Sequence, residues 1–202
     1  MAPSTTATND DLALLQALQR GDDEAYAVLV RQHGRQMLAT AKRILGCDED
    51  AQDCLQEMFL SAFRSIGAFE GKSRLSTWLH RIIVNVALMK LRSRRARPEH
   101  SIEDLLPQFS EDGHHLEPPC PWSENAIASL QTSESRQLLR RAIEQLPDGY
   151  REVVLLRDIE GLSTETTGQM LGITTNAAKI RLHRARQALR TLLSPHCKDL
   201  IS

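Results

Sequence analysis

The chain of 202 residues has little of what several kinds of functional site require. Aromatic residues make up 4% of it, four cysteines are scattered along it, and no apolar run is long enough to span a bilayer. The cysteines lack the closely spaced pairs of a zinc module. We therefore expect a cytoplasmic protein with reduced cysteines, no metal, no cofactor and no membrane insertion.

The groups needed for covalent catalysis are also missing from the pattern. We find neither a nucleophile beside a base nor a phosphate-binding glycine loop, so the sequence predicts no enzyme activity. The alternative in which the protein is an enzyme is a metal-dependent one that uses His114, His115 and Cys120 with nearby acidic residues. The prolines around these residues argue against a rigid site there.

Charge is strongly segregated, although the formal net charge is only -1. Residues 72–97 contain eight lysines and arginines and no acidic residue, and none lies between Glu165 and Asp199. Residues 98–135 carry acidic residues but no lysine or arginine. Two basic segments separated by an acidic one indicate two anion-binding surfaces.

Apolar residues recur at helical spacing through most of the chain, and no alternating strand pattern competes with them. The predicted fold class is all-α, with two small helical domains joined by a flexible acidic linker that contains prolines. We expect the following divisions: a disordered N-terminus over 1–9, a helical domain over 10–97, the linker over 98–131, a second helical domain over 132–194, and a tail over 195–202.

The first domain should contain five helices. They are expected over about 10–20, from residue 22 into the low thirties, up to Gly46, over 49–65, and from Leu75 onwards. In the helix over 49–65, the apolar spacing leaves an acidic and amide face with one exposed leucine, formed by Asp53, Gln56, Glu57 and Leu60. Such a face could dock a basic partner.

The most informative stretch lies between residues 163 and 190. Ser163 can cap a helix over about 164–171, and Gly172 stands where a helix end needs a positive φ. Thr174 can cap a second helix, whose apolar stripe leaves a purely basic face exposed. This order of cap, helix, glycine, cap and basic helix is typical of a helix-turn-helix that binds DNA.

A second candidate DNA site is the glycine-containing loop from Ala68 and the helix that follows it. The loop offers cations and hydroxyls at a helix N-terminus, which is suited to anions, and aromatic groups beside cations can hold unstacked bases. Trp78 may be read either as a core residue or as a stacking platform. The candidate residues are Phe69, Lys72, Ser73, Arg74, Ser76, Thr77, Trp78, Arg81, Asn85 and Arg92.

Several short motifs occur in a fixed order along about residues 22–97 and 132–193. They include Glu24-Ala25-Tyr26, Asp50-Ala51-Gln52-Asp53, Gln56-Glu57-Met58-Phe59, Phe69-Glu70-Gly71, Thr77-Trp78-Leu79-His80-Arg81-Ile82, Asn85-Val86-Ala87 and Arg181-Leu182-His183-Arg184-Ala185-Arg186. In these motifs the chain resembles the extracytoplasmic-function (ECF) sigma factors, the small two-domain class of bacterial transcription initiation factors.

The resemblance implies a division of labour between the two domains. The first would bind core RNA polymerase through Asp53, Gln56, Glu57 and Leu60, and would melt the -10 element of promoter DNA near the 69–78 loop. The second would read the -35 element with the helix that starts at Thr175; its DNA contacts would be Thr175, Asn176, Lys179, Arg181, Arg184 and Arg186. An anti-sigma factor is a further implied partner, and the acidic linker would follow the RNA path through the polymerase.

The chain departs from the family pattern in three places: Gln52 replaces the usual Glu, Met89 stands where Asp is usual, and Thr167-Gly168 replace Ile-Ala. We expect Met89 to be buried. Gly168 should either allow closer approach of helices or cost about 1 kcal/mol of helix stability. The competing interpretation is a helix-turn-helix transcriptional regulator with a sensor domain, although a sensor has no need of the second basic surface.

Overall fold

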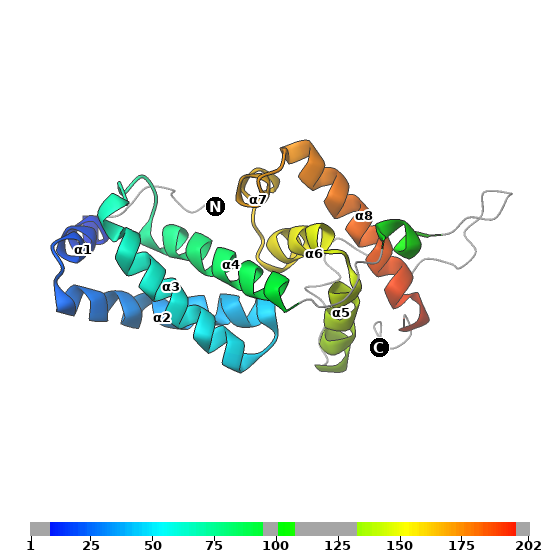
Figure 1. The fold of residues 1–202 in the computed structure, drawn as a ribbon, viewed down its shortest axis with the longest axis horizontal. Coiled ribbons are helices and arrows are strands. Elements are labelled where there is room, and N and C mark those ends of the chain that lie inside the picture. The colour runs from blue at the N-terminus through cyan, green and yellow to red at the C-terminus, as the bar shows by residue number, and fades with distance from the viewer. Residues whose placement is uncertain (1–8, 95–100, 108–132, 197–202) are drawn as a thin grey trace, which may run out of the picture. The chain divides into compact units, whose positions relative to one another are not determined.

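The computed structural model describes residues 9–94, 101–107 and 133–196. The chain divides into two compact units, Met1–Arg95 and Ala96–Ser202, which are described separately below. Every regular element of the described residues is helical, so the predicted all-α fold class is confirmed (Figure 1). None of the described helices is long and apolar enough to cross a membrane.

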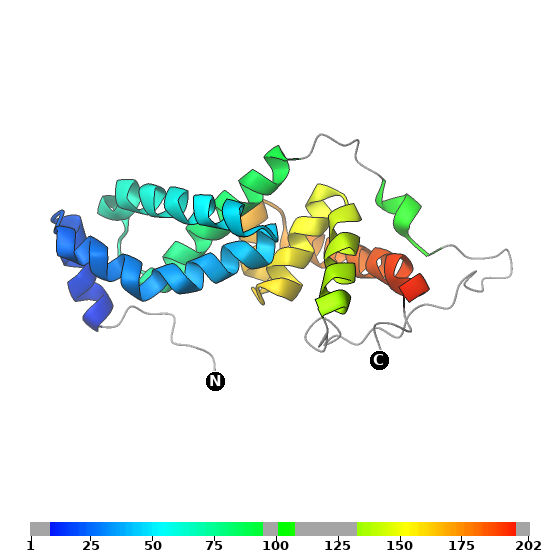
Figure 2. The ribbon, with the colours of Figure 1, turned by 90° about the horizontal axis from the view of Figure 1, so that it is seen from below.

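The first unit is built from four α-helices and one short turn: α1 (Asn9–Gln19), α2 (Asp23–Leu45), α3 (Asp48–Ser65), η1 (Ile66–Ala68) and α4 (Leu75–Ser93). Helices α2, α3 and α4 pack on one another pairwise, and α1 lies across one end of them (Figures 1 and 2). Their shared core is fully buried and includes Leu29, Met37, Met58, Leu79 and Ile83.

One helix, α2, replaces the two that were expected between Asp22 and Gly46, so that expectation is wrong. Asp22 caps α2 by accepting a 2.9 Å hydrogen bond from Glu24 N, and Gly46 ends it with φ 71°. A glycine at position 34 weakens a helix locally by about 1 kcal/mol, but packing overrides that preference. Gly34 is buried against the ring of Phe59.

The buried stripe of α4 leaves out Met89, which was expected to belong to the buried residues. Its fully buried members are Leu75, Leu79, Ile83, Val84, Ala87 and Leu88, whereas Trp78 is half-buried. Met89 is 65% exposed, so the expectation that it is buried is wrong. One step along a helix turns a side chain by about 100°, and Leu88 already faces the core, so Met89 is carried round to solvent.

The second unit contains α5 (Ser133–Gln145), α6 (Asp148–Val154), the single π-turn η3 (Leu155–Ile159), α7 (Thr164–Leu171), α8 (Thr175–Leu193) and η4 (Ser194–His196). Helix α8 packs against α5, α6 and α7, and its buried stripe includes Ala178, Leu182, Ala185 and Leu189. A further turn, η2 (Ile102–Leu105), also packs on α8, although it lies within the range expected to be a linker.

Helices α7 and α8 form the predicted helix-turn-helix with the predicted caps. Ser163 Oγ accepts from Thr166 N at 3.0 Å, and Thr174 Oγ1 accepts from Ala177 N at 3.1 Å. Gly172 has φ 65°. Gly168 lies so close to the turn that a Cβ on it would be 2.9 Å from the backbone oxygen of Ile173. Gly168 therefore allows the backbone of the turn to approach α7 closely.

Candidate nucleic-acid interface

The N-terminal half of α8 presents a continuous polar and apolar surface to solvent. Thr175, Asn176 and Lys179, which the sequence analysis selected, are all exposed. Two further exposed residues share this surface and were not among the predicted DNA contacts: Ile180, which is 52% exposed, and His183. Their helical spacing from Asn176, four and seven positions, was the signal that could have identified them.

The three arginines selected on α8 differ from these residues because their guanidinium groups lie against their own unit. Arg186 makes a bidentate pair with Asp158, with nitrogen–oxygen distances of 3.0 and 2.7 Å. Arg184 donates to Glu103 at 3.2 Å. Arg181 lies beside α6, where a Cβ on Gly149 would be 3.1 Å from its Nη1. Charge alone therefore overstated the number of cations available on α8.

The loop before α4 is fixed by an aromatic stack and by α1. Phe69 and Trp78 stack with ring centroids 4.8 Å apart, so Trp78 joins the loop to the helix. Gln19 donates to the carbonyl oxygen of Phe69 at 3.1 Å. Gly71 has φ 69°, and a Cβ there would be 3.4 Å from Leu15 on α1. Trp78 is neither a fully buried core residue nor a free platform.

The other residues selected near this loop differ in exposure. Lys72 is exposed and pairs with Glu70, Thr77 is exposed, and Ser73, Arg74 and Ser76 are half-buried. Further along α4, one helical face carries four exposed residues at steps of four and three: Arg81, Asn85, Met89 and Arg92. Three of them were selected from the sequence, and Met89 interrupts their polar character with an apolar group.

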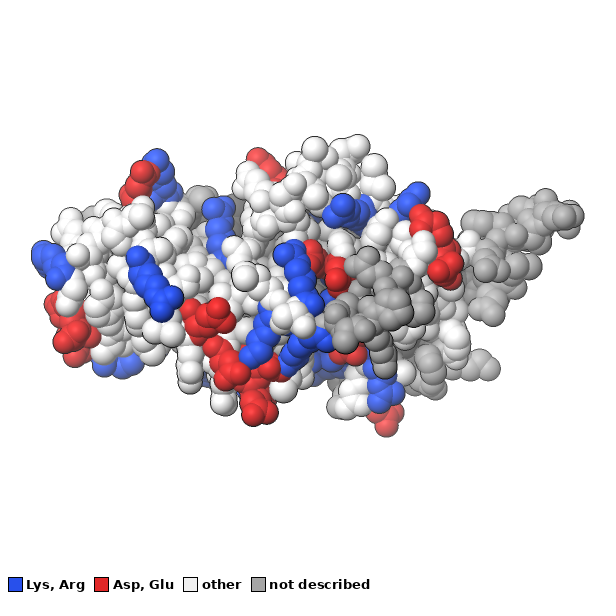
Figure 3. Space-filling model, viewed as in Figure 1, with Lys and Arg blue, Asp and Glu red and all other residues white. Residues whose placement is uncertain are grey.

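Helix α3 carries the acidic and amide face expected from the sequence. Asp53, Gln56, Glu57 and Leu60 are all exposed, Leu60 to 54%. Acidic side chains gather over the N-terminal end of α3 on the side seen in Figure 3, where Asp48, Glu49 and Asp50 form the first turn. This end of α3 is the most acidic part of the first unit's visible face.

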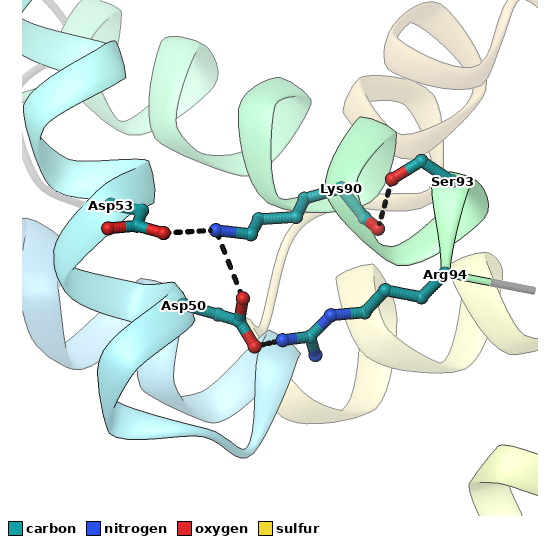
Figure 4. Close-up of polar contacts among 5 residues, drawn as sticks. All are labelled: Asp50, Asp53, Lys90, Ser93 and Arg94. Carbon is teal, nitrogen blue, oxygen red and sulfur yellow. Dashed lines mark hydrogen bonds and ion pairs between the residues drawn. The ribbon is translucent and has the colours of Figure 1, made fainter.

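Two cations of α4 bind this acidic end (Figure 4). Lys90 Nζ lies 2.8 Å from Asp53 Oδ2 and 3.0 Å from Asp50 Oδ1, and Arg94 pairs with the second oxygen of Asp50. The pKa of Lys90 is raised, chiefly because its ammonium donates to Asp53. Lys90 and Arg94 belong to the basic segment 72–97, but they tie α4 to α3 rather than facing away from the unit.

The cysteines of the first unit are free thiols in different settings. Cys54 is buried, and this desolvation raises its pKa, while Cys47 is half-buried at the start of α3. Within the described ranges no group of three or more potential metal-ligating side chains occurs. The residues of the alternative metal site, His114, His115 and Cys120, lie outside the described residues.

Comparison with known proteins places the chain in a family. The family model Sigma-70 region 2 matches residues 29–97, and Sigma-70, region 4 matches residues 136–189. The RNA polymerase sigma-H factor of Pseudomonas aeruginosa is 33% identical over 192 residues, covering 94% of this chain and 96% of that protein. The ECF RNA polymerase sigma factor SigM of Mycobacterium tuberculosis is 36% identical over 183 residues, covering 91% and 84%. The chain belongs to the ECF sigma factors.

Solved structures agree on the fold of this sigma factor. CnrH, in complex with the cytosolic domain of CnrY, is 24% identical with a TM-score of 0.58, covering 93% of this chain and 99% of that one. RpoE from Bartonella quintana, in complex with the anti-sigma factor NepR, is 23% identical with a TM-score of 0.51, covering 91% and 94%. As a member of the family shown by the two Sigma-70 regions and the sigma-factor relatives, the chain directs transcription initiation. Region 2 occupies the segment that the competing regulator would use as a sensor domain, which excludes that alternative.

Proposed function

We propose that this sigma factor reads the -35 promoter element with the exposed N-terminal half of α8. The observation that carries the proposal is the capped α7–α8 pair with Thr175, Asn176 and Lys179 exposed at the start of the second helix. Recognition helices contact base edges from this end. Ile180 extends the surface with an aliphatic group suited to a thymine methyl, and His183 lies one turn beyond Lys179.

Arg181, Arg184 and Arg186 belong to this proposal in a secondary role. Asp158 holds Arg186 through two hydrogen bonds, which leaves it poorly placed for a base edge. It can orient α8 against the turn that follows α6, while the DNA contacts come mainly from the residues nearer the helix start.

The first unit would melt the -10 element with the 69–78 loop and the exposed face of α4. The Phe69–Trp78 stack offers a rigid aromatic wall, and the half-buried Ser73 and Ser76 lie between its two residues in the sequence. An extruded base costs a few kcal/mol of stacking, which such a wall and neighbouring polar groups can offset. Arg81, Asn85 and Arg92 would follow the strand along α4.

Core RNA polymerase would bind the outer face of α3. Gln56, Glu57 and Leu60 are exposed together, and an acidic rim around one apolar group fits a basic partner with a matching apolar patch. Asp53 stands at the edge of this face and shares its charge with Lys90. The proposed division follows the two units, with the segment over 98–131 between their matched regions.

An anti-sigma factor is the remaining proposed partner. The sigma factor RpoE from Bartonella quintana was solved with the anti-sigma factor NepR, and CnrH was solved with the cytosolic domain of CnrY. A regulator of this type would act by covering the polymerase-binding and DNA-binding faces. We also propose that the chain works in the cytoplasm and contributes no catalytic chemistry of its own, since sigma factors act on RNA polymerase and leave RNA synthesis to it.

Run-off transcription with bacterial core RNA polymerase on a library of promoter fragments tests the proposal. Start sites that depend on the added protein would support it, and would yield the -35 and -10 sequences together. Duplex binding without dependent start sites would contradict the assignment of α3 as the polymerase face. Neither binding nor start sites would contradict the assignments on both units.

A charge-matched pair of variants tests the role of α8. Lys179→Gln and Arg140→Gln each remove one exposed cation of the second unit, from α8 and from α5 respectively. We expect Lys179→Gln to weaken binding to the -35 duplex and to lower the slope of log K against log salt by about one. Arg140→Gln should leave both unchanged. Equal effects of the two variants would show that net charge, rather than α8, binds the duplex.

A further inference from the structure

A short acidic turn lies on the helix that carries the proposed -35 readers. Turn η2 packs on α8, and Ser101 caps it by accepting from Glu103 N at 3.4 Å. Ile102 is 4% exposed and anchors the turn, whereas Glu103 and Asp104 are exposed. Of these two, Glu103 reaches Arg184 on α8, with 3.2 Å between Oε1 and Nη1. Figure 1 shows the turn, in green, beside α8.

We propose that η2 is an internal competitor for DNA: Glu103 occupies Arg184 in the free protein, and duplex binding displaces it. The inference rests on the proposed DNA-binding role of α8. It adds a built-in restraint on that role, contributed by a segment outside both matched regions.

The chemistry of the pair supports competition. Carboxylate and phosphate present the same kind of oxygen acceptor to a guanidinium, so Arg184 can satisfy one or the other. The pKa of Glu103 is lowered, first by the Ser101 hydroxyl, then by its own backbone N–H and by Arg184, so its contacts favour the charged carboxylate that pairs with Arg184. Arg184 lies four positions, about one helical turn, beyond the exposed Ile180, so release of its guanidinium would extend the DNA-facing surface of α8.

The expected size of the restraint follows from exposure. The Arg184 and Glu103 side chains are 43% and 64% exposed, so the pair itself is weak. A pair of this kind changes an equilibrium by about 2- to 5-fold at low salt. Burial of Ile102 keeps the carboxylate near its partner, which raises its effective concentration relative to a free acidic group.

The test measures fluorescence anisotropy of a labelled duplex that carries the -35 element of a protein-dependent start site, with the full chain. Glu103→Gln removes the charge facing Arg184, and Asp104→Asn removes an equal charge from the same turn. We expect Glu103→Gln to tighten binding about 2- to 5-fold at low salt, and this gain to shrink as salt is raised, because salt screens the exposed pair that restrains the wild-type chain. Asp104→Asn should change affinity much less. Equal gains, or no gain, would overturn the proposal.

Hydrogen exchange of the same chain separates this inference from the proposed function. We expect backbone amides of residues 101–106 to exchange faster once the duplex is bound, because the turn leaves α8. If the wild-type chain binds no duplex, the proposed role of α8 itself fails. If the duplex binds while exchange in 101–106 stays unchanged, the role of α8 stands and the competition is refuted.

Discussion

Alanine at two buried helical glycines should shift stability in opposite directions. Gly34 in α2 and Gly168 in α7 are both buried within helices, and alanine in a helix interior is favoured over glycine by about 1 kcal/mol. The two sites differ in the room that each offers to an added Cβ atom. A Cβ on Gly168 would lie 2.9 Å from the backbone oxygen of Ile173, whereas one on Gly34 would lie 3.9 Å from the Phe59 ring.

The geometry sets the sign of each effect. The Ile173 oxygen belongs to a turn that is held on both sides, because Ile173 N donates to Gly168 O at 2.9 Å and Thr174 caps α8. Relief of the contact must move the turn, and overpacking of this kind costs about 1–3 kcal/mol. Subtracting the helix gain, Gly168→Ala should destabilise the second unit by up to about 2 kcal/mol, while Gly34→Ala stabilises the first by up to about 1 kcal/mol.

Hydrogen exchange of the full chain across a urea series measures both effects separately. Peptides from α4 report the first unit and peptides from α8 report the second, so neither unit needs to be isolated. If Gly168→Ala raised the protection of α8 as Gly34→Ala raises that of α4, the contact with Ile173 would carry no cost. The argument from close packing in the helix-turn-helix would then be refuted.

Two further substitutions test buried polar groups that have no hydrogen-bond partner among the residues the structure describes. Thr167 is fully buried with an unpaired hydroxyl, so Thr167→Val should stabilise the second unit by about 1 kcal/mol in the same exchange assay; destabilisation would mean that the hydroxyl is satisfied. Burial lowers the pKa of His33 below its ordinary 6.5, and the charge of Asp11 opposes this shift only in part. Between the lowered pKa and 6.5, the folded chain therefore binds fewer protons than the unfolded chain. Stability of the first unit should therefore fall as pH drops through that window, and His33→Gln should flatten the profile; an unchanged profile would exclude His33 as its source.

Local signals in the sequence predicted the helix-turn-helix closely. Ser163, Gly172 and Thr174 act through their own backbone neighbours, so their types specify the helix ends without knowledge of the rest of the fold. Gly34 shows where such signals fail. A glycine in a helical pattern resembles a helix end, and only packing against Phe59 from another helix keeps α2 continuous.

Surface charge was the other quantity that the sequence could not specify. Lys90 lies in the last turn of α4 and Arg94 directly follows that helix, yet their partners come from α3, about forty positions earlier in the chain, so a linear charge count cannot find them. Met89 shows the same limit for apolar groups. Its neighbours in sequence suggested a buried stripe, but the rotation of α4 on α2 and α3 decides which side is covered.

The net charge of -1 is low for a DNA-binding protein, and within each unit acidic side chains pair with many of the cations. Asp50 and Asp53 hold cations of α4, Asp158 holds Arg186, and Glu103 holds Arg184. Each phosphate contact that a protein gives up makes the slope of log K against log salt shallower by about 0.9. It also lowers the affinity for duplexes of any sequence. Side chains that read bases lose nothing by this pairing. Acidic partners near the proposed DNA faces therefore shift recognition from general attraction to phosphate towards the few exposed residues at the start of α8.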